Sequence, residues 1–335
     1  MPHSEAIKAS LKRGALVTAA NWEVIAIQFV AESAFKALLV VPVAGAAFLL
    51  ALLVGSSVEE VITGDLRQTM ALAIAALGAH TPALVAYLGG VAAVVVGGSL
   101  LMFLVKAGSV AVLVQAERRS PAVERPPLMV ATVRQAEAFT LERFAEGMVA
   151  LRGRFVSLGL CLLAVYAATG AVYLMGLMGS YRWAGVVEAR WLGPTLAALA
   201  STLLVAWITV VNLLYLLTQI LIASRDLSVG GALAALPRLV VVEWRLVGGV
   251  FLVMLVLVVL ATAASILASA ALGVIGFVPF AGFAMLPLQL LAWLARGLLF
   301  EFLGLSALTA YARVLRSLDG SSRASVAAIA PAGVQ

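Results

Sequence analysis

The stretch that decides the fold is residues 246–272, LVGGVFLVMLVLVVLATAASILASAAL, which holds no charged side chain over its whole length. The hydrocarbon core of a bilayer is about 30 Å thick, and an α-helix needs roughly 20 apolar residues to cross it. Lipid offers the backbone no hydrogen-bond partner, so an apolar stretch of this length crosses as a helix. Residues 246–272 therefore predict a membrane-spanning helix.

Five further apolar runs lie on either side of this one. The composition agrees with them, because 64% of the 335 residues are hydrophobic and 11% are charged, against about 45–50% and about 25% in soluble domains. The sequence therefore predicts an all-α, polytopic integral membrane helical bundle with six transmembrane helices and amphipathic helices on its cytoplasmic side. The other predicted spans are approximately residues 36–54, 82–105, 155–179, 192–223 and 280–300.

The basic residues indicate the orientation. Sixteen of the 22 Lys and Arg residues lie in the N-terminal arm, in the connections after the second and fourth spans, and in the tail. Bases concentrate on the cytoplasmic side of membrane proteins, so both termini are predicted there. Because these bases lie beside apolar spans, we expect anionic lipid headgroups as partners and no nucleic acid. The Arg-, Ala- and Val-rich composition favours the inner membrane of a prokaryote. The opposite side carries Arg67, Arg182 and Arg190.

The chain alternates basic or amphipathic segments with membrane hairpins. Ser4 to Ala20, Leu128 to Leu151 and Leu227 to Val242 have apolar residues at helical spacing. They predict helices that lie along the membrane surface or pack under the bundle. The tail from Asp319 is predicted to be disordered. Each amphipathic segment and the membrane hairpin that follows it form one unit. The three units are either a true repeat or a chance similarity in an Ala-, Val- and Gly-rich chain. The segments are residues 1–35 (N-terminal amphipathic), 36–114 (hairpin 1), 115–154 (cytoplasmic amphipathic), 155–223 (hairpin 2), 224–245 (amphipathic), 246–312 (hairpin 3) and 313–335 (cytoplasmic tail).

Three bases lie at the ends of predicted spans, namely Lys36, Lys106 and Arg296. One interpretation is that they extend to the headgroups and fix the depth of the helices. The other is that they form a cytoplasm-facing pocket for an anion or a lipid headgroup. Asn212 and Gln219 lie seven residues apart in the fourth span, where they predict interhelical hydrogen bonds or, alternatively, the lining of a substrate path.

Small residues recur every four positions in two spans. Such ridges allow helix backbones to approach closely in lipid. They predict packing within the chain or, alternatively, a seam for another membrane protein subunit. The ridges are Gly89, Ala93 and Gly97 in the second span, and Ala261, Ser265, Ser269 and Gly273 in the fifth.

Residues for catalysis, metals and cofactors are scarce in this sequence. It has one cysteine, Cys161, and two histidines, and it contains no G-x-x-x-x-G-K-[ST], H-E-x-x-H, G-x-S-x-G or C-x-x-C motif. We therefore predict no enzyme activity, no catalytic or metal-binding residues and no cofactor.

The stretch from Ser228 to Arg313 carries a resemblance. It contains Ala-Leu-Ala-Ala-Leu (232–236), a Gly-Phe-Val-Pro-Phe-Ala-Gly turn (276–282) and Ala-Tyr-Ala-Arg (310–313). In these features it resembles the membrane region attached to some prokaryotic glycerophosphodiester phosphodiesterases and its stand-alone relatives. The resemblance covers about a quarter of the chain and implies the topology alone, because the acidic catalytic domain of those hydrolases has no counterpart here.

These observations favour a non-catalytic scaffold or accessory subunit that organises lipid or a larger membrane assembly. The alternative is a transporter or lipid-handling permease with a cytoplasm-facing basic pocket. An intramembrane enzyme would require an acid–base or metal pair, which the sequence does not offer.

Overall fold

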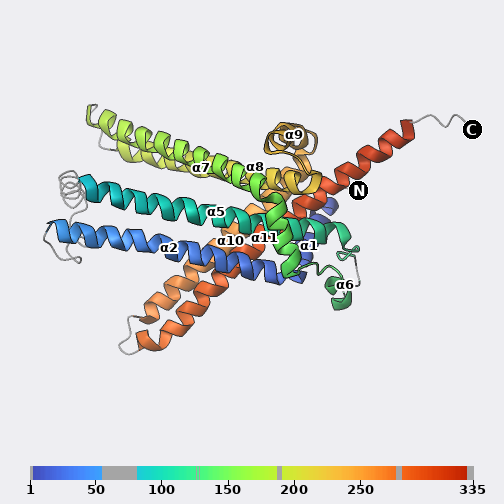
Figure 1. The fold of residues 1–335 in the computed structure, drawn as a ribbon, viewed down its shortest axis with the longest axis horizontal. Helices are drawn as coiled ribbons and strands as arrows, with labels where there is room; N and C mark the ends of the chain where they lie inside the picture. The colour runs from blue at the N-terminus through green and yellow to red at the C-terminus, as the bar shows by residue number, and fades with distance from the viewer. Residues whose placement is uncertain are drawn as a thin grey trace, which may run out of the picture. The chain divides into compact units, whose positions relative to one another are not determined.

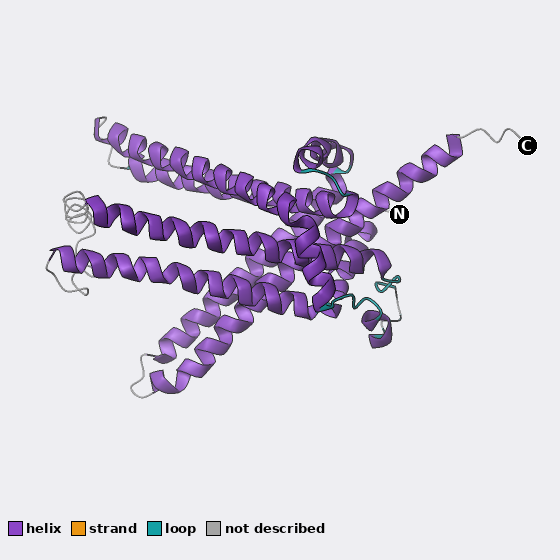
Figure 2. Ribbon diagram, in the orientation of Figure 1, coloured by secondary structure: helices purple, strands orange, loops and turns teal. Residues whose placement is uncertain are grey.

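A computed structural model describes residues 3–54, 81–125, 127, 129–186, 191–276 and 281–329. The described residues form helices and no strand (Figures 1 and 2). Six helices are long and apolar enough to cross a membrane, so the chain is the all-α polytopic membrane protein that the sequence predicts. The helices are α1 (His3–Ala20), α2 (Trp22–Val54), α5 (Thr81–Arg119), α6 (Val130–Arg134), α7 (Leu141–Val186), α8 (Leu192–Arg225), α9 (Val229–Val242), α10 (Trp244–Gly276) and α11 (Ala281–Ile329).

The chain divides into two compact units, residues 27–105 and residues 1–26 with 106–335. The smaller unit pairs most of α2 with the first part of α5. There the hydroxyl of Tyr87 donates a hydrogen bond to the carbonyl of Pro42 at 3.1 Å. A Cβ at Gly98 would collide with the ring of Phe35, so glycine is what permits this contact between the two helices.

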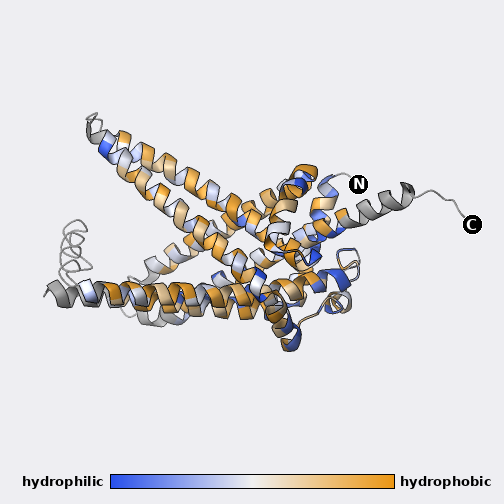
Figure 3. Cartoon of the chain, turned by 45° about the horizontal axis from the view of Figure 1, so that its top comes forward, coloured by the Kyte–Doolittle hydropathy of each residue, from blue (hydrophilic) through white to orange (hydrophobic). Residues whose placement is uncertain are grey.

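The larger unit has a core that we call the basal core. It is formed where five helices bury a side chain to 2% exposure or less: Val17 of α1, Leu113 of α5, Phe155 of α7, Ile220 of α8 and Tyr311 of α11. Away from this core the helices carry exposed apolar side chains, such as Leu203 on α8 and Leu267 on α10. Figure 3 shows these lengths as almost continuously hydrophobic. They belong to the helices that are long and apolar enough to cross a membrane.

Helix α1, the predicted amphipathic helix of Ser4 to Ala20, packs against the helices of the larger unit. Its buried face packs against α11, where the hydroxyls of Thr18 and Thr309 lie 3.1 Å apart. At Gly14 the backbones approach so closely that a Cβ would lie 2.6 Å from the carbonyl oxygen of Ser306. The buried face of α1 therefore packs on protein.

Helix boundaries differ from the sequence-based segments at three places. The predicted boundary at residues 35 and 36 lies inside α2, which begins at Trp22. The predicted surface helix from Leu128 to Leu151 is instead the short α6 followed by the start of α7, which continues into the membrane span. No proline interrupts residues 141–186, so nothing ends the helix there. The predicted disordered tail is helical as far as Ile329.

The predicted helix from Leu227 to Val242 corresponds to α9. Ser228 precedes it in an extended conformation, and its hydroxyl accepts a hydrogen bond from the backbone N–H of Gly231 at 3.2 Å. This is the usual arrangement of an N-terminal helix cap. It explains why α9 begins at Val229, shortly after Asp226 ends α8 with a φ of 54°.

Candidate functional site

A buried arginine lies at the centre of the basal core. Arg13 is 2% exposed, and all five of its N–H groups donate hydrogen bonds. Its Nε donates to Oε1 of Glu117 at 3.0 Å, and one Nη1 hydrogen bond reaches Oε2 of Glu124 at 3.0 Å. The other three bonds go to backbone carbonyls, those of Pro121 (2.6 Å), Glu117 (2.9 Å) and Ser120 (2.8 Å). A guanidinium has five donors, so this one is fully satisfied.

Two arginines of α11 complete what we call the arginine–carboxylate cluster: Arg13, Glu117, Glu124, Arg313 and Arg316. Arg313 Nη1 lies 2.6 Å from Oε1 of Glu124, and Arg316 Nη1 lies 3.3 Å from Oε2 of Glu117. Burial raises the pKa of the Glu124 carboxyl. Hydrogen bonds from Arg313, from its own backbone and from Arg13 outweigh burial, so the pKa lies below the ordinary 4.5.

The cluster also caps the carboxyl end of α5. The last carbonyls of a helix lack partners within it and carry partial negative charge. Pro121 cannot continue the helix, and Arg13 takes up the carbonyls of Glu117 and Ser120. Arg316 donates to the carbonyl of Glu117 at 2.8 Å and to that of Arg118 at 3.2 Å. The cluster therefore holds α1, α5 and α11 together at one point.

Asn21 makes a second buried polar junction between α1 and α2. Its side chain is fully buried. Its Nδ2 donates to the carbonyls of Val17 (2.8 Å) and Ala136 (3.0 Å), and its Oδ1 accepts from the N–H groups of Ala138 (2.8 Å) and Phe139 (3.0 Å). Four hydrogen bonds from one amide fix the segment between α6 and α7 against the end of α1.

Sequence reasoning missed both arrangements. It counted Arg13, Arg313 and Arg316 as bases that set the orientation, not as partners of buried acids. One signal was present, because Ser10, Gly14 and Val17 are small or apolar and share a helix face with Arg13, and all of them are buried. An arginine among such residues requires partners in the core.

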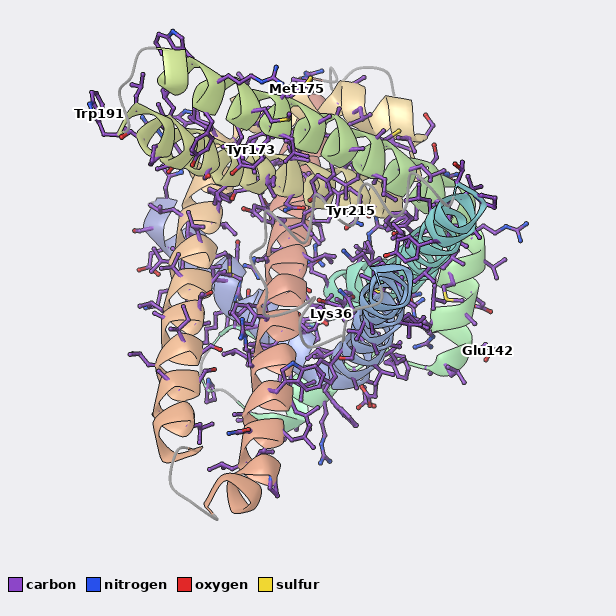
Figure 4. The ribbon with its side chains drawn as sticks, turned by 90° about the vertical axis from the view of Figure 1, so that its left-hand side faces the viewer. Lys36, Glu142, Tyr173, Met175, Trp191 and Tyr215 are labelled. Atoms are coloured by element: carbon purple, nitrogen blue, oxygen red, sulfur yellow. The ribbon has the colours of Figure 1, made fainter. Side chains whose placement is uncertain are left out.

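The three bases predicted as a pocket have separate surroundings. Lys36 belongs to the smaller unit and pairs with Glu32 at 2.5 Å. Lys106 Nζ lies 5.7 Å from the ring centroid of Tyr215 on α8, and Arg296 lies 5.9 Å from that of Phe300 on its own helix. Figure 4 shows Lys36 on α2 and Tyr215 on α8. In the larger unit, Lys106 and Arg296 thus contact aromatic rings on different helices.

The two ridges of small residues also differ. On α5, no described atom lies within 4 Å of a Cβ placed at Gly89 or Gly97, so those glycines make no close helix contact there; Ala93 lies between them. On α10, the ridge residues line a groove of about 480 Å³ beside α11. The α11 side of this groove includes Gln289, Trp293 and Arg296. The α10 side includes Ala261, Ser265, Ser269 and Gly273.

Hydrogen bonds link α7 and α8 inside the membrane span. The hydroxyl of Tyr166 donates to Oδ1 of Asn212 at 2.5 Å, and the hydroxyls of Tyr173 and Ser201 lie 2.8 Å apart. Tyr173 is labelled beside α8 in Figure 4. Asn212 is therefore an interhelical contact, as one interpretation of the sequence predicts. Gln219, which lies seven residues further along α8, is buried.

A second, more polar pocket of about 540 Å³ opens where α5 ends, α7 begins and α8 ends. We call it the arginine pocket, because Arg118 and Arg119 of α5 and Arg143 of α7 line it together with Glu146. Sequence analysis did not single out these arginines. Among the residues that the structure describes, no three His, Cys, Asp or Glu side chains gather as metal ligands. The remaining lining residues are Ala111, Val114, Gln115, Gly147, Ala150, Leu151 and Ala223.

The fold and these sites define a class, the multi-pass α-helical membrane protein. No protein-family model, no curated protein and no solved structure matches the chain.

Proposed function

We propose that this protein is a non-catalytic scaffold or accessory subunit of a larger membrane assembly, which it joins through the α10–α11 hairpin. The observation that supports the proposal is the groove on that hairpin. Its α10 side consists largely of small side chains from Ala261 to Gly273, and its α11 side carries the exposed rings and chains of Trp293 and Leu299. A small-residue surface facing lipid is the kind of surface against which a further helix packs.

Burial in the membrane spans supports the same proposal. In the apolar windows of α8 and α10, 0% and 11% of the residues are buried. The buried side chains of these helices lie instead in the basal core, as with Ile220 and Val250. The spans therefore offer wide apolar faces to lipid or to other membrane subunits. We place the basal core and both termini on the cytoplasmic side of a prokaryotic inner membrane, because the bases concentrate there.

The test is isolation of the protein in mild detergent with mass measurement of intact particles. We expect particles that contain a second chain. Ala268→Leu fills the groove and should release that chain, whereas Ala270→Leu, the same change at an exposed α10 position outside the groove lining, should retain it. A wild-type protein that runs as a monomer without a partner contradicts the proposal, and so does equal behaviour of the two variants.

A second candidate function is a lipid-handling permease, and Arg296 favours it. Its guanidinium and the amide of Gln289 line a groove that is otherwise apolar. A charged side chain at membrane depth is costly and is often a functional residue. Reconstituted vesicles test this candidate: transbilayer movement of a labelled phospholipid that is lost in Arg296→Leu supports a permease. No movement in the wild-type protein excludes it.

A further inference from the structure

The arginine pocket is formed by helices that are in contact at its floor. A Cβ at Gly147 would lie 2.5 Å from the Cβ of Ala111, and both residues line the pocket. One turn away, a Cβ at Gly108 would lie 2.9 Å from the ring of Phe144. Two glycines therefore allow α5 and α7 to touch. Because closely packed backbones have little room to move, the distance between the arginines of the two helices is set before any ligand arrives.

Among the described residues, the arginines of this pocket form no ion pair, and Glu146 is the one carboxylate in the lining. Arg118 donates to the carbonyl of Ser224, and Arg143 Nη1 donates to the carbonyl of Ala138 at 3.0 Å. In the described part of the chain, Arg119 has no hydrogen bond or ion pair. The acids closest to Arg119 in the sequence are Glu117 and Glu124. Both of them pair with arginines of the arginine–carboxylate cluster.

The charges and the size of the pocket define what it would bind. Three arginines and Glu146 give the lining a net charge of +2. Guanidinium groups form paired hydrogen bonds with phosphate oxygens, more specifically than ammonium groups do. The volume of about 540 Å³ lies within the roughly 300–1,000 Å³ of small-ligand sites. Glu146 adds an acceptor for a hydroxyl group beside the phosphate.

The position of the pocket identifies the source of the phosphate. Arg118 and Arg119 form the last turn of α5, a helix long enough to cross the bilayer and continue beyond it. Basic residues just outside a membrane span lie at the level of anionic headgroups. We infer that the arginine pocket binds the phosphate of an anionic phospholipid headgroup that carries hydroxyl groups. This inference goes beyond the proposed function and rests on its placement of the basal core on the cytoplasmic side of the membrane.

The test uses the full chain in detergent with the bound lipid counted by native mass spectrometry. The probes are dioleoylphosphatidylglycerol and, separately, dioleoylphosphatidylcholine. We expect Arg119→Gln/Arg143→Gln to bind phosphatidylglycerol about tenfold more weakly, since charge-assisted hydrogen bonds are lost. Arg152→Gln is the matched control, because Arg152 is an exposed arginine of α7 outside the pocket lining. Arg119→Gln alone guards against a folding defect, because the exposed Arg119 side chain forms no hydrogen bond or ion pair with the described residues.

A second arm separates lipid from soluble phosphate. Inorganic phosphate is added to lipid-free protein, and binding is followed by broadening of the phosphorus NMR line. Phosphate binding that the double variant loses, with phosphatidylglycerol binding unchanged, assigns the pocket to a soluble phosphate compound and overturns the headgroup inference. Equal binding of both probes by wild type and double variant overturns the site altogether. The native mass spectra of the first arm also show whether a partner chain is bound. Failure of the scaffold proposal is therefore seen independently of lipid binding.

Discussion

The carboxylate of Glu117 receives the guanidinium of Arg13 at 3.0 Å, although the two residues lie 104 positions apart and both side chains are at most 3% exposed. This pair connects α1 to the carboxyl end of α5. The hydrogen bonds of Arg13 to backbone carbonyls make it a helix cap as well as an ion pair. Such a pair is costly to bury, but it is far more costly to break.

Replacement of Arg13 should therefore destabilise the protein strongly. We expect Arg13→Gln to lower the free energy of unfolding by about 3 kcal/mol, because it leaves two buried acids with fewer donors. Denaturant unfolding in detergent, followed by far-UV circular dichroism, measures the change. Lys12→Gln on the same helix is the control and should shift stability by less than about 0.5 kcal/mol. Equal stability of the two variants would show that the arginine–carboxylate cluster does not hold the core.

Gly14 should be intolerant of even one methyl group. A Cβ there would lie 2.6 Å and 2.9 Å from backbone atoms of Ser306 and Ala310, so Gly14→Ala must push α1 away from α11 at a cost of about 1–3 kcal/mol. Gly153→Ala on α7 meets nothing within 4 Å and should be neutral or stabilising by up to about 1 kcal/mol. Thermal unfolding midpoints of the two variants give the comparison. A stabilising Gly14→Ala would contradict the α1–α11 contact.

Asn21 should control the local order of the segment between α6 and α7. In Asn21→Ala the N–H groups of Ala138 and Phe139 lose the oxygen that accepts their hydrogen bonds, and each unsatisfied buried group costs about 1–3 kcal/mol. Hydrogen–deuterium exchange should therefore become faster at those two amides. Gln135→Ala, a change of an exposed residue nearby, should leave their exchange as it is in the wild type.

Acid should weaken the basal core through Glu124. The pKa of this carboxyl is lower in the folded chain than its ordinary 4.5, so the unfolded chain takes up its proton first as the pH falls. The stabilisation is complete above about pH 4.5 and is lost as the pH drops through the lower folded value. Glu124→Gln should be less stable than wild type at pH 7 and should lose less stability below pH 4.5. Parallel stability curves for the two proteins would rule out this contribution.

The sequence predicts the membrane architecture well, because hydrophobic length and the absence of charge are local properties. Residues 246–272 need no tertiary information to be recognised as a span, and α10 lies there. The same holds for α9, whose start depends on Ser228 alone.

The basal core was beyond such reasoning because its determinants are not local. The charge count treats every base near a span alike, yet Arg13 is buried among acids more than a hundred residues away and Arg152 is exposed. Amphipathicity also has two causes. A helix with one apolar face can lie on headgroups or on another helix, and the sequence pattern of α1 did not reveal the close fit of Gly14 against Ala310.

The candidate sites show the same division. The contacts of Lys36 with Glu32 and of Arg296 with Phe300 follow from a spacing of four residues on one helix. The contact of Lys106 with Tyr215 joins α5 to α8 and depends on how the two helices pack. The arginine pocket depends on the contact of Gly147 on α7 with Ala111 on α5. The sequence does not show which residues of two such helices lie opposite each other.

Helix α7 has 46 residues without a proline, which gives a rod about 69 Å long, more than twice the roughly 30 Å of the hydrocarbon core. Its first turns line the arginine pocket, and the rest crosses the bilayer as the same rigid body. The arginine pocket and the exposed rings of Tyr181 and Trp183 therefore lie at opposite ends of one uninterrupted helix.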